Sequence, residues 1–265
     1  MDATSEHPEP DAVDLARVAA LVDSAERVVV LTGAGISTDS GIPDFRGPNG
    51  VWTKNPKAEK TSHITHYLND PEVRQLAWQT RIHSPAWSAR PNAGHEALVQ
   101  LERRGKLHAL VTQNIDELHQ RAGTTPDKVM EVHGTMRRYV CWSCHDEGPM
   151  ETMLDRVRAG ESDPACLLCG GIVKSATISF GQPLVAVVID RALRVAEEGD
   201  LLLAVGSTLQ VYPVANMVPR ARAAGATVVI VNGGPTAMDH LADEVLHGST
   251  SVVLPAICVT GPTLA

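Results

Sequence analysis

Four of the five cysteines could hold a metal ion, because Cys141, Cys144, Cys166 and Cys169 form the pattern C-x2-C-x21-C-x2-C. Two chelating turns of this spacing supply four thiolates for one tetrahedral Zn2+. A redox C-x2-C motif needs only one pair, so two pairs fit it poorly. A site closed by four cysteines keeps no open position for water. We therefore predict one structural zinc ion per chain, with no catalytic role.

The stretch LTGAGISTDSGIPDFRG, residues 31–47, begins like a dinucleotide-binding loop. Gly33 and Gly35 supply G-x-G, but Thr38 stands where the third glycine of G-x-G-x-x-G belongs. Asp44 comes too early for the acidic residue that binds the adenosine ribose, about 20 positions further on. We therefore expect this stretch to serve the nicotinamide end, with Phe45 over the reacting ribose and Arg46 orienting Asp44 or a phosphate. Alternatively, G-x-G alone is an ordinary strand-to-helix turn.

Polar or small residues also follow four later apolar runs: Gln113, Asn114 and Asp116, then His133, then Gly206 and Ser207, and then Asn232. Each group taken singly could be a turn or a helix cap. In an open α/β sheet, however, the carboxyl ends of the strands share one edge, where ligands bind. The coincidence at five strand ends predicts a nucleotide site at that edge.

The remaining pattern is an alternation of apolar runs and helical stretches. After the run that ends at Gly33, apolar runs recur at 107–113, 128–134, 176–181, 201–207, 227–234 and 251–255, and helical stretches at 12–25, 93–104, 114–122, 184–198 and 214–224. Continuous apolar character indicates strands buried on both faces, as in a parallel sheet. The alternation predicts a doubly wound α/β fold, interrupted by a mixed segment at 48–90 and by the cysteine segment.

Charge and the N-terminus limit the classes of partner and the location. A formal net charge of −8 argues against nonspecific binding to nucleic acid or to an anionic membrane. The N-terminus, MDATSEHPEPD, lacks the basic start and apolar core of a signal peptide. An odd number of cysteines, with Cys258 left over, argues against a disulfide framework. We expect a cytoplasmic protein with no nucleic-acid or membrane partner.

Together these motifs resemble the sirtuin family of NAD-dependent protein lysine deacylases, of bacterial type. The similarity runs from about Val28 to Leu254 and includes, in order, GAGISTDSGIPDFR, TQNID, HG at 133–134, both cysteine pairs, FG at 180–181, GSTLQVYP and NGGPT. It implies a Rossmann-like NAD-binding domain formed by 13–47, 91–137 and 176–265. It also implies a helical cofactor-loop insert at 48–90 and a zinc-binding module at 138–175. Residues 1–12, which are acidic and contain proline, are expected to form a flexible tail.

The resemblance also implies the site residues. NAD would be held by Gly33, Ala34, Gly35, Ser37, Asp44, Phe45, Arg46, Gln113, Asn114, Asp116, Gly206, Ser207, Asn232 and Thr250. His133 would be the general base and Asn114 a second catalytic residue. Ile178, Phe180 and Gly181 would pair with the acyl-lysine substrate peptide as an added strand.

The implied reaction removes acetyl or other acyl groups from protein lysines and yields nicotinamide, O-acyl-ADP-ribose and free lysine. An unperturbed histidine titrates near pH ~6.5, which suits a base that works at neutral pH. One alternative is ADP-ribosyl transfer to a protein at the same NAD site. Another is a binding module regulated by nucleotide, although a binder has no need of His133.

The sequence departs from the family pattern near the expected substrate site. Gln182 stands where FGE is commoner, and Lys174-Ser175-Ala176 replaces an Arg-Pro-Asp/Asn-like run. Members that prefer succinyl or malonyl lysine carry a Tyr and an Arg three apart in the insert, where this chain has Ala77 and Thr80. We therefore expect a preference for neutral acyl groups.

Overall fold

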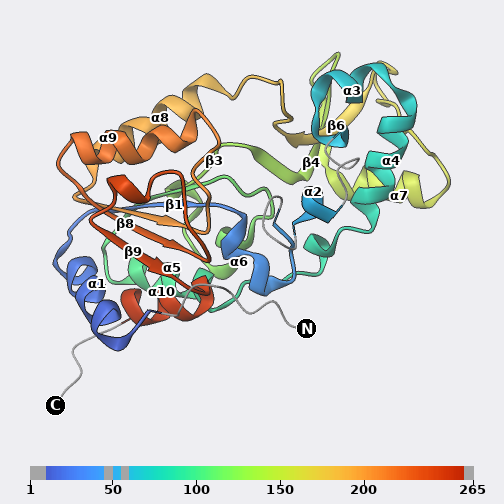
Figure 1. The fold of residues 1–265 in the computed structure, drawn as a ribbon. Coiled ribbons are helices and arrows are strands. Elements are labelled where there is room, and N and C mark those ends of the chain that lie inside the picture. The colour runs from blue at the N-terminus through green and yellow to red at the C-terminus, as the bar shows by residue number, and fades with distance from the viewer. Residues whose placement is uncertain (1–9, 45–49, 55–59, 260–265) are drawn as a thin grey trace.

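A computed structural model describes residues 10–44, 50–54 and 60–259. In these ranges the strands form a six-stranded parallel sheet of order β3-β2-β1-β7-β8-β9 and a three-stranded antiparallel sheet of order β5-β4-β6 (Figure 1). The large sheet comprises β1 (Val28–Thr32), β2 (Leu107–Thr112), β3 (Val129–Glu131), β7 (Leu201–Val205), β8 (Thr227–Asn232) and β9 (Glu244–His247). The small sheet comprises β4 (Gly134–Cys141), β5 (Glu147–Pro149) and β6 (Val173–Thr177). The first order is that of a Rossmann fold, which confirms the predicted α/β class.

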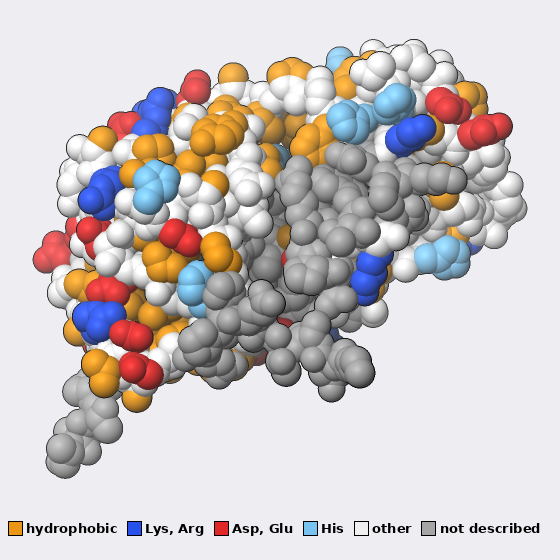
Figure 2. All heavy atoms as spheres, viewed as in Figure 1, with side chains coloured by type: hydrophobic (Ala, Val, Ile, Leu, Met, Phe, Trp, Pro, Cys, Tyr) orange, Lys and Arg blue, Asp and Glu red, His pale blue; other side chains and the backbone are white. Residues whose placement is uncertain are grey.

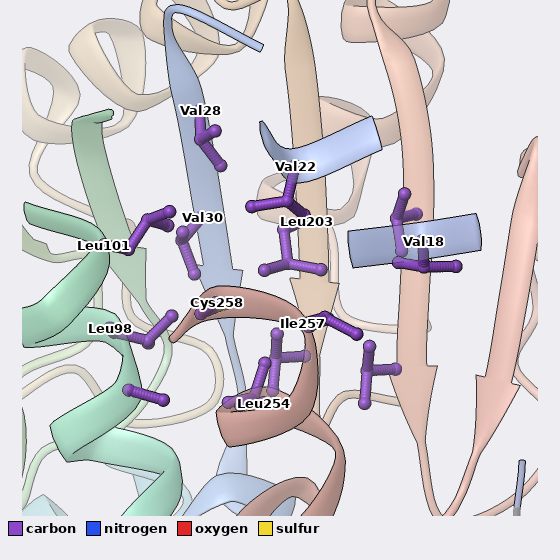
Figure 3. Close-up of a cluster of buried hydrophobic side chains, with 14 of the residues drawn as sticks. Val18, Val22, Val28, Val30, Leu98, Leu101, Leu203, Leu254, Ile257 and Cys258 are labelled. Carbon is purple, nitrogen blue, oxygen red and sulfur yellow. The ribbon is translucent and has the colours of Figure 1, made fainter. Parts of the chain in front are cut away.

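Helices cover both faces of the large sheet, which explains its continuous apolar runs. One face packs on α1 (Ala12–Ser24), α5 (Ala93–Arg103) and α10 (Thr250–Cys258), as Figure 3 shows for Val30 of β1 near Leu98 and Leu101 of α5. The other face packs on α8 (Ala186–Glu198) and α9 (Met217–Ala223). Because successive side chains of a strand alternate between faces, Val29 and Leu31 contribute to this second core.

A smaller core lies in the region of the second sheet. It joins Trp78 of α4 (Pro71–Ile82) to Leu154 of α7 (Met150–Arg158), and it includes Cys141 and Cys166. The short helices α2 (Val51–Lys54) and α3 (Ile64–Asn69) complete the region seen at the upper right of Figure 1. The predicted helical insert therefore packs on the cysteine segment. β4 and β6 cross the residue numbers 137/138 and 175/176 that we used as domain boundaries, and the boundaries themselves stay a prediction.

Two predicted strands are wrong. The run 251–255 lies in α10, where Val253, Leu254, Ile257 and Cys258 face the core at helical spacing and Ser249 accepts a hydrogen bond from the Ser251 N–H. A run in which nearly every residue is apolar hides its period, so strand and helix look alike. The run 176–181 contributes only its first two residues to a strand, β6, which pairs antiparallel with β4 in the small sheet.

The predicted helix at 114–122 is also shorter than expected. The regular helix is α6 (Leu118–Ala122), and the preceding residues form an irregular loop. Glu117 adopts a left-handed conformation with φ of 62°, and the Asp116 carboxylate accepts from the Leu118 N–H. The loop thus leaves Gln113, Asn114 and Asp116 at the end of β2 instead of on a helix.

The surface carries charges of both signs. On the left side of the face in Figure 2, acidic and basic side chains are interspersed. Ion pairs such as Arg17–Glu244 form on the surface. None of the helices in the described ranges combines the length and apolar character needed to cross a bilayer.

Candidate active site and metal centre

The point at which the strand order reverses lies between β1 and β7, and ligands of open α/β sheets bind there. The chain after β1 and the chain after β7 cross in direct contact. The Gly33 N–H donates to the Val205 carbonyl oxygen (2.9 Å), and the Gly35 N–H donates to the Gly206 carbonyl oxygen (2.8 Å). A Cβ on Gly33 or Gly35 would lie 2.7 Å from an atom of Gly206. These glycines are required because two backbones cross here.

This crossing also explains why Thr38 can replace the third glycine. That glycine normally lets a long helix pack closely on the strand. Here β1 is followed by two short 3-10 helices, Ala34–Ile36 and Thr38–Ser40, where a dinucleotide-binding loop normally opens a long helix. Thr38 is exposed, and its hydroxyl donates to the Gly35 carbonyl oxygen (3.0 Å). The turn ends at Gly41, which has a φ of 83°.

The TQNID residues meet the first loop through buried hydrogen bonds. The Asn114 amide donates to the Gly33 carbonyl oxygen (3.1 Å) and to the Ser37 hydroxyl (3.2 Å), and Ser37 donates to the Asp116 carboxylate (2.8 Å). Next to them, the Gln113 amide donates to the Ser207 hydroxyl (2.9 Å). Residues that follow β1, β2 and β7 are therefore brought together, as the strand ends predicted.

His133 lies one step along the same edge, after β3. Its Nδ1 lies 2.9 Å from the Gln113 carbonyl oxygen. A carbonyl can only accept, so Nδ1 carries the proton and Nε2 of the neutral ring keeps its lone pair. Burial lowers the pKa of His133, while the Gln113 carbonyl opposes that shift. The ring is thus held neutral at neutral pH with a basic nitrogen opposite its anchoring bond.

The other predicted cofactor residues divide into three groups. Ala34 lies in the first 3-10 helix, and Asp44 follows it along the same chain. At the end of β8, the Asn232 amide donates to the Gly234 carbonyl oxygen (2.7 Å), while Thr250 is buried at the start of α10 and its hydroxyl lies 3.4 Å from the Gly35 carbonyl oxygen. Phe45 and Arg46 lie outside the described residues.

The predicted substrate segment starts beside His133. The Ile178 N–H donates to the His133 carbonyl oxygen (2.8 Å). Phe180 forms a parallel bridge with residues 62–64: its N–H donates to the Ser62 carbonyl oxygen (2.8 Å), and its carbonyl oxygen accepts from the Ile64 N–H (3.0 Å). Gly181 follows with a φ of 79°. Both backbone groups of Phe180 are therefore engaged within the chain.

The four predicted metal ligands converge. The sulfur atoms of Cys141, Cys144, Cys166 and Cys169 all lie within 4.8 Å of one another, with 3.5 Å between Cys141 and Cys169 and 3.7 Å between Cys144 and Cys166. Ligand sulfurs about 2.3 Å from a tetrahedral Zn2+ lie about 3.8 Å apart. The donor set and its spacing therefore fit zinc.

Sequence reasoning missed a buried polar layer beneath the TQNID loop. It consists of Thr32, Thr112 and His119, each at most 2% exposed and linked by hydrogen bonds. Thr112 is the first residue of TQNID, but Thr32 lies in an apolar run and His119 in a helical stretch, and no spacing in the sequence brings the three together. The burial of Lys174 was not predicted either: this residue is 1% exposed and donates to the Ser175 carbonyl oxygen (2.8 Å) and to that of Thr177.

The strand-end residues fit NAD as a ligand. Amides, hydroxyls and one carboxylate from three strand ends converge at the reversal point of a Rossmann-type sheet, and such groups bind ribose and nicotinamide. A Cβ on Gly233, after β8, would meet no atom within 4 Å, so this strand end leaves open space. Fold and site together define an α/β enzyme of the NAD-binding class with a four-thiolate module.

Comparison with known proteins agrees. The Sir2 family matches residues 33–213. "NAD-dependent protein deacetylase 2" of Streptomyces coelicolor is 48% identical over 230 residues, covering 87% of this chain and 95% of that protein. "NAD-dependent protein deacetylase" of Sulfolobus acidocaldarius is 41% identical over 242 residues, covering 91% and 92%. A solved Sir2 variant with a deacetylated p53 peptide and 3′-O-acetyl ADP-ribose superposes with a TM-score of 0.85 at 32% identity, covering 92% and 97%. The chain belongs to the Sir2 family.

Proposed function

We propose that this protein removes acetyl groups, and other neutral acyl groups, from protein lysines in an NAD-dependent reaction that yields nicotinamide, O-acyl-ADP-ribose and free lysine. One observation carries the proposal: the His133 ring is anchored through Nδ1 at the edge where the strand ends converge. A nucleotide-binding module needs no base there. The names of the relatives support the same activity.

NAD supplies a ribose carbon whose bond to nicotinamide can break. On the protein side, Asn114, Ser37 and Asp116 form a buried, mutually hydrogen-bonded set that holds its donors in fixed directions before any ligand enters. Such preorganisation lowers the cost of orienting the reacting groups. We assign this set to the nicotinamide ribose, together with Ala34, Gly35, Asp44, Phe45 and Arg46.

We assign the phosphates and the adenosine end of NAD to residues at the point where the strand order reverses and at the end of β8. Gln113 and Ser207 are already joined by a hydrogen bond, and Gly206 lets the two chains cross beside them. These residues and Gly33 hold the phosphates and ribose, and Asn232 holds the adenosine end. Thr250 is assigned to the same ligand, and its hydroxyl, 3.4 Å from the Gly35 carbonyl oxygen, ties the start of α10 to the first loop.

His133 is the general base. With Nδ1–H bound to the Gln113 carbonyl, Nε2 can accept a proton from a ribose hydroxyl, and the same bond steadies the ring once it is charged. The lowered pKa keeps His133 unprotonated at pH 7. The acid limb of the activity profile should therefore lie below the ordinary histidine pKa of ~6.5.

The substrate peptide pairs with the segment after β6. Both backbone groups of Phe180 are engaged, so the pairing falls to the Ile178 carbonyl and to Gly181. The Gln182 amide oxygen accepts from the Ser179 N–H (3.3 Å), so this side chain shapes its own loop. An added strand beside Ile178 would lie next to His133, because the two residues share a hydrogen bond.

Zinc has a structural role in this proposal. The four thiolates would close the coordination sphere of the ion, and Cys141 and Cys166 belong to the small core with Trp78 and Leu154. We also propose that the protein works in the cytoplasm, where reduced thiols persist.

The test separates the two halves of the reaction. Nicotinamide departs before a base is needed, so His133→Ala should lower product formation by at least about 100-fold. Exchange of labelled nicotinamide into NAD, with acetyl peptide present, should survive better. Asn114→Ala is the matched variant, and it should lose both reactions together. A folded His133→Ala protein with full deacylation would remove His133 from the mechanism.

A further inference from the structure

His119 lies beneath the proposed site without facing it. It is on α6, it is 1% exposed, and its Nε2 is 2.9 Å from the Thr32 hydroxyl at the end of β1. Thr32 donates in turn to the Thr112 hydroxyl (2.8 Å), its partner in the β1–β2 register. The Thr112 hydroxyl accepts from the Asn114 N–H (3.0 Å). An unbroken chain of buried hydrogen bonds thus runs from His119 to the backbone of Asn114.

The direction of each bond fixes the state of the histidine. A hydroxyl has one proton, and Thr32 gives it to Thr112, so the Thr32 oxygen must accept from His119. His119 is therefore the neutral Nε2–H tautomer. Its Nδ1 is buried without a partner among the described residues, and the nearby His95 ring has its centroid 4.9 Å away. None of the described residues accepts a hydrogen bond from Nδ1.

Close packing at this level of the sheet does not by itself require polar side chains. At the same level of the sheet, Thr32 pairs on its other side with Val205, which is fully buried and apolar. The Thr112 hydroxyl is needed as the acceptor for the Asn114 N–H, but apolar side chains of similar shape in place of Thr32 and His119 would leave no backbone group without a partner. The Thr32 hydroxyl can rotate, and a donor on its oxygen directs its proton toward Thr112; His119 is that donor.

We propose that His119 is a positioning residue, which holds the Thr32 and Thr112 hydroxyls in one orientation and thereby fixes the backbone of Asn114. The inference rests on the role proposed above for Asn114. Asn114 also reaches Gly33 and Ser37 through its amide, so a shift of its backbone moves the whole ribose-binding set. Displacements of about 1 Å at such a set cost about 100-fold in rate.

Amide variants test the geometry. The amide nitrogen introduced by His119→Gln lies near the former Nε2 and can donate to Thr32, whereas the shorter amide of His119→Asn lies near Nδ1 and cannot. We expect His119→Gln to keep kcat within about tenfold of wild type, and His119→Asn and His119→Leu to lose about 10- to 100-fold. If His119 has only a structural role, the activity of each variant should follow its Tm, and the position of the amide nitrogen in the Gln and Asn variants should not matter. Equal kcat for the Gln and Asn variants at equal folded fraction would overturn the proposal.

Two further measurements test the chain of hydrogen bonds independently of the amide variants. Thr32→Val should lower kcat about as much as His119→Leu does. The variant that carries both substitutions should lose no more activity than either single variant. Additive losses would contradict the proposal that the two residues act through one chain of hydrogen bonds. Heteronuclear NMR of the imidazole nitrogens, without NAD, should show a neutral Nε2–H tautomer for His119, and the opposite tautomer would refute the assignment. This readout does not depend on activity. A wild type that shows the tautomer but no NAD-dependent nicotinamide release would contradict the proposed function and leave the hydrogen-bond chain in place.

Discussion

Gly134 is the residue whose replacement by alanine should damage the site most without touching a ligand. It follows His133, has a φ of 72° and pairs with Thr177, where β4 and β6 cross. A Cβ built on it would lie 2.1 Å from the Ala176 carbonyl oxygen, which is backbone and cannot rotate aside. Relief of that contact requires the two chains to separate by about 1 Å, since the surrounding interior is close-packed.

This separation would stretch the hydrogen bond between the Ile178 N–H and the His133 carbonyl oxygen. The base would therefore move away from the proposed peptide-binding segment. We expect Gly134→Ala to lower kcat/KM for an acetyl peptide by about 100-fold. The left-handed backbone adds about 1–2 kcal/mol of destabilisation, or a few degrees in Tm. Steady-state deacylation and thermal unfolding should be measured on the same samples.

Gly160 provides the matched control. Its φ is 106°, and a Cβ there would meet no atom within 4 Å. Gly160→Ala should therefore show backbone strain without a clash: a modest loss of Tm and full activity. If the two variants lose equal activity, or if folded Gly134→Ala is as active as wild type, the argument that this crossing sets the position of His133 is refuted.

Three further predictions concern the metal, the acyl group and pH. Cys141→Ser should release zinc, unfold the small core and lower activity indirectly, because structural sites contribute folding free energy; a metal-free, fully active and folded variant would contradict this. Acetyl peptide should be deacylated with a higher kcat/KM than its succinyl version, because Ala77 and Thr80 offer no cation to a buried carboxylate, and faster succinyl removal would refute that placement. Burial lowers the pKa of His95 to about 4, so the unfolded chain binds this proton more readily between pH ~6.5 and 4. Stability from His95, up to about 3 kcal/mol, should thus be present above pH ~6.5 and lost as the pH falls through 4, and His95→Gln should flatten that slope in denaturant titrations; an unchanged slope would count against it.

The sequence predicted the parts of the fold in which one physical cause dominates. All five residues of β1 are buried, and a strand buried on both faces is a continuous apolar run. Within the alternating pattern, this run therefore predicted a strand. The cysteine cluster followed from ligand spacing alone. β9 was not predicted, because Glu244–His247 is a short edge strand that contains both polar and apolar residues. α10 was misread because its burial hides the helical period.

The candidate site shows the same division. Strand ends identified Asn114, Asp116 and Ser207, since the carboxyl edge of a parallel sheet is where such residues gather. The network beneath them could not be predicted, because Thr32, Thr112 and His119 belong to three elements and meet only through the β1–β2 register. The engagement of Phe180 by residues 62–64 likewise depends on a long-range contact.

The most direct test of the central claim is to incubate the zinc-loaded protein with NAD and an acetyl-lysine peptide and to follow both products by mass spectrometry. The proposed function predicts that the peptide loses its acetyl mass and that nicotinamide and O-acetyl-ADP-ribose appear in equal amounts, with no nicotinamide release when the lysine is unmodified. A peptide or protein that instead gains the mass of ADP-ribose while keeping its acetyl group would contradict the account and identify an ADP-ribosyltransferase at the same site.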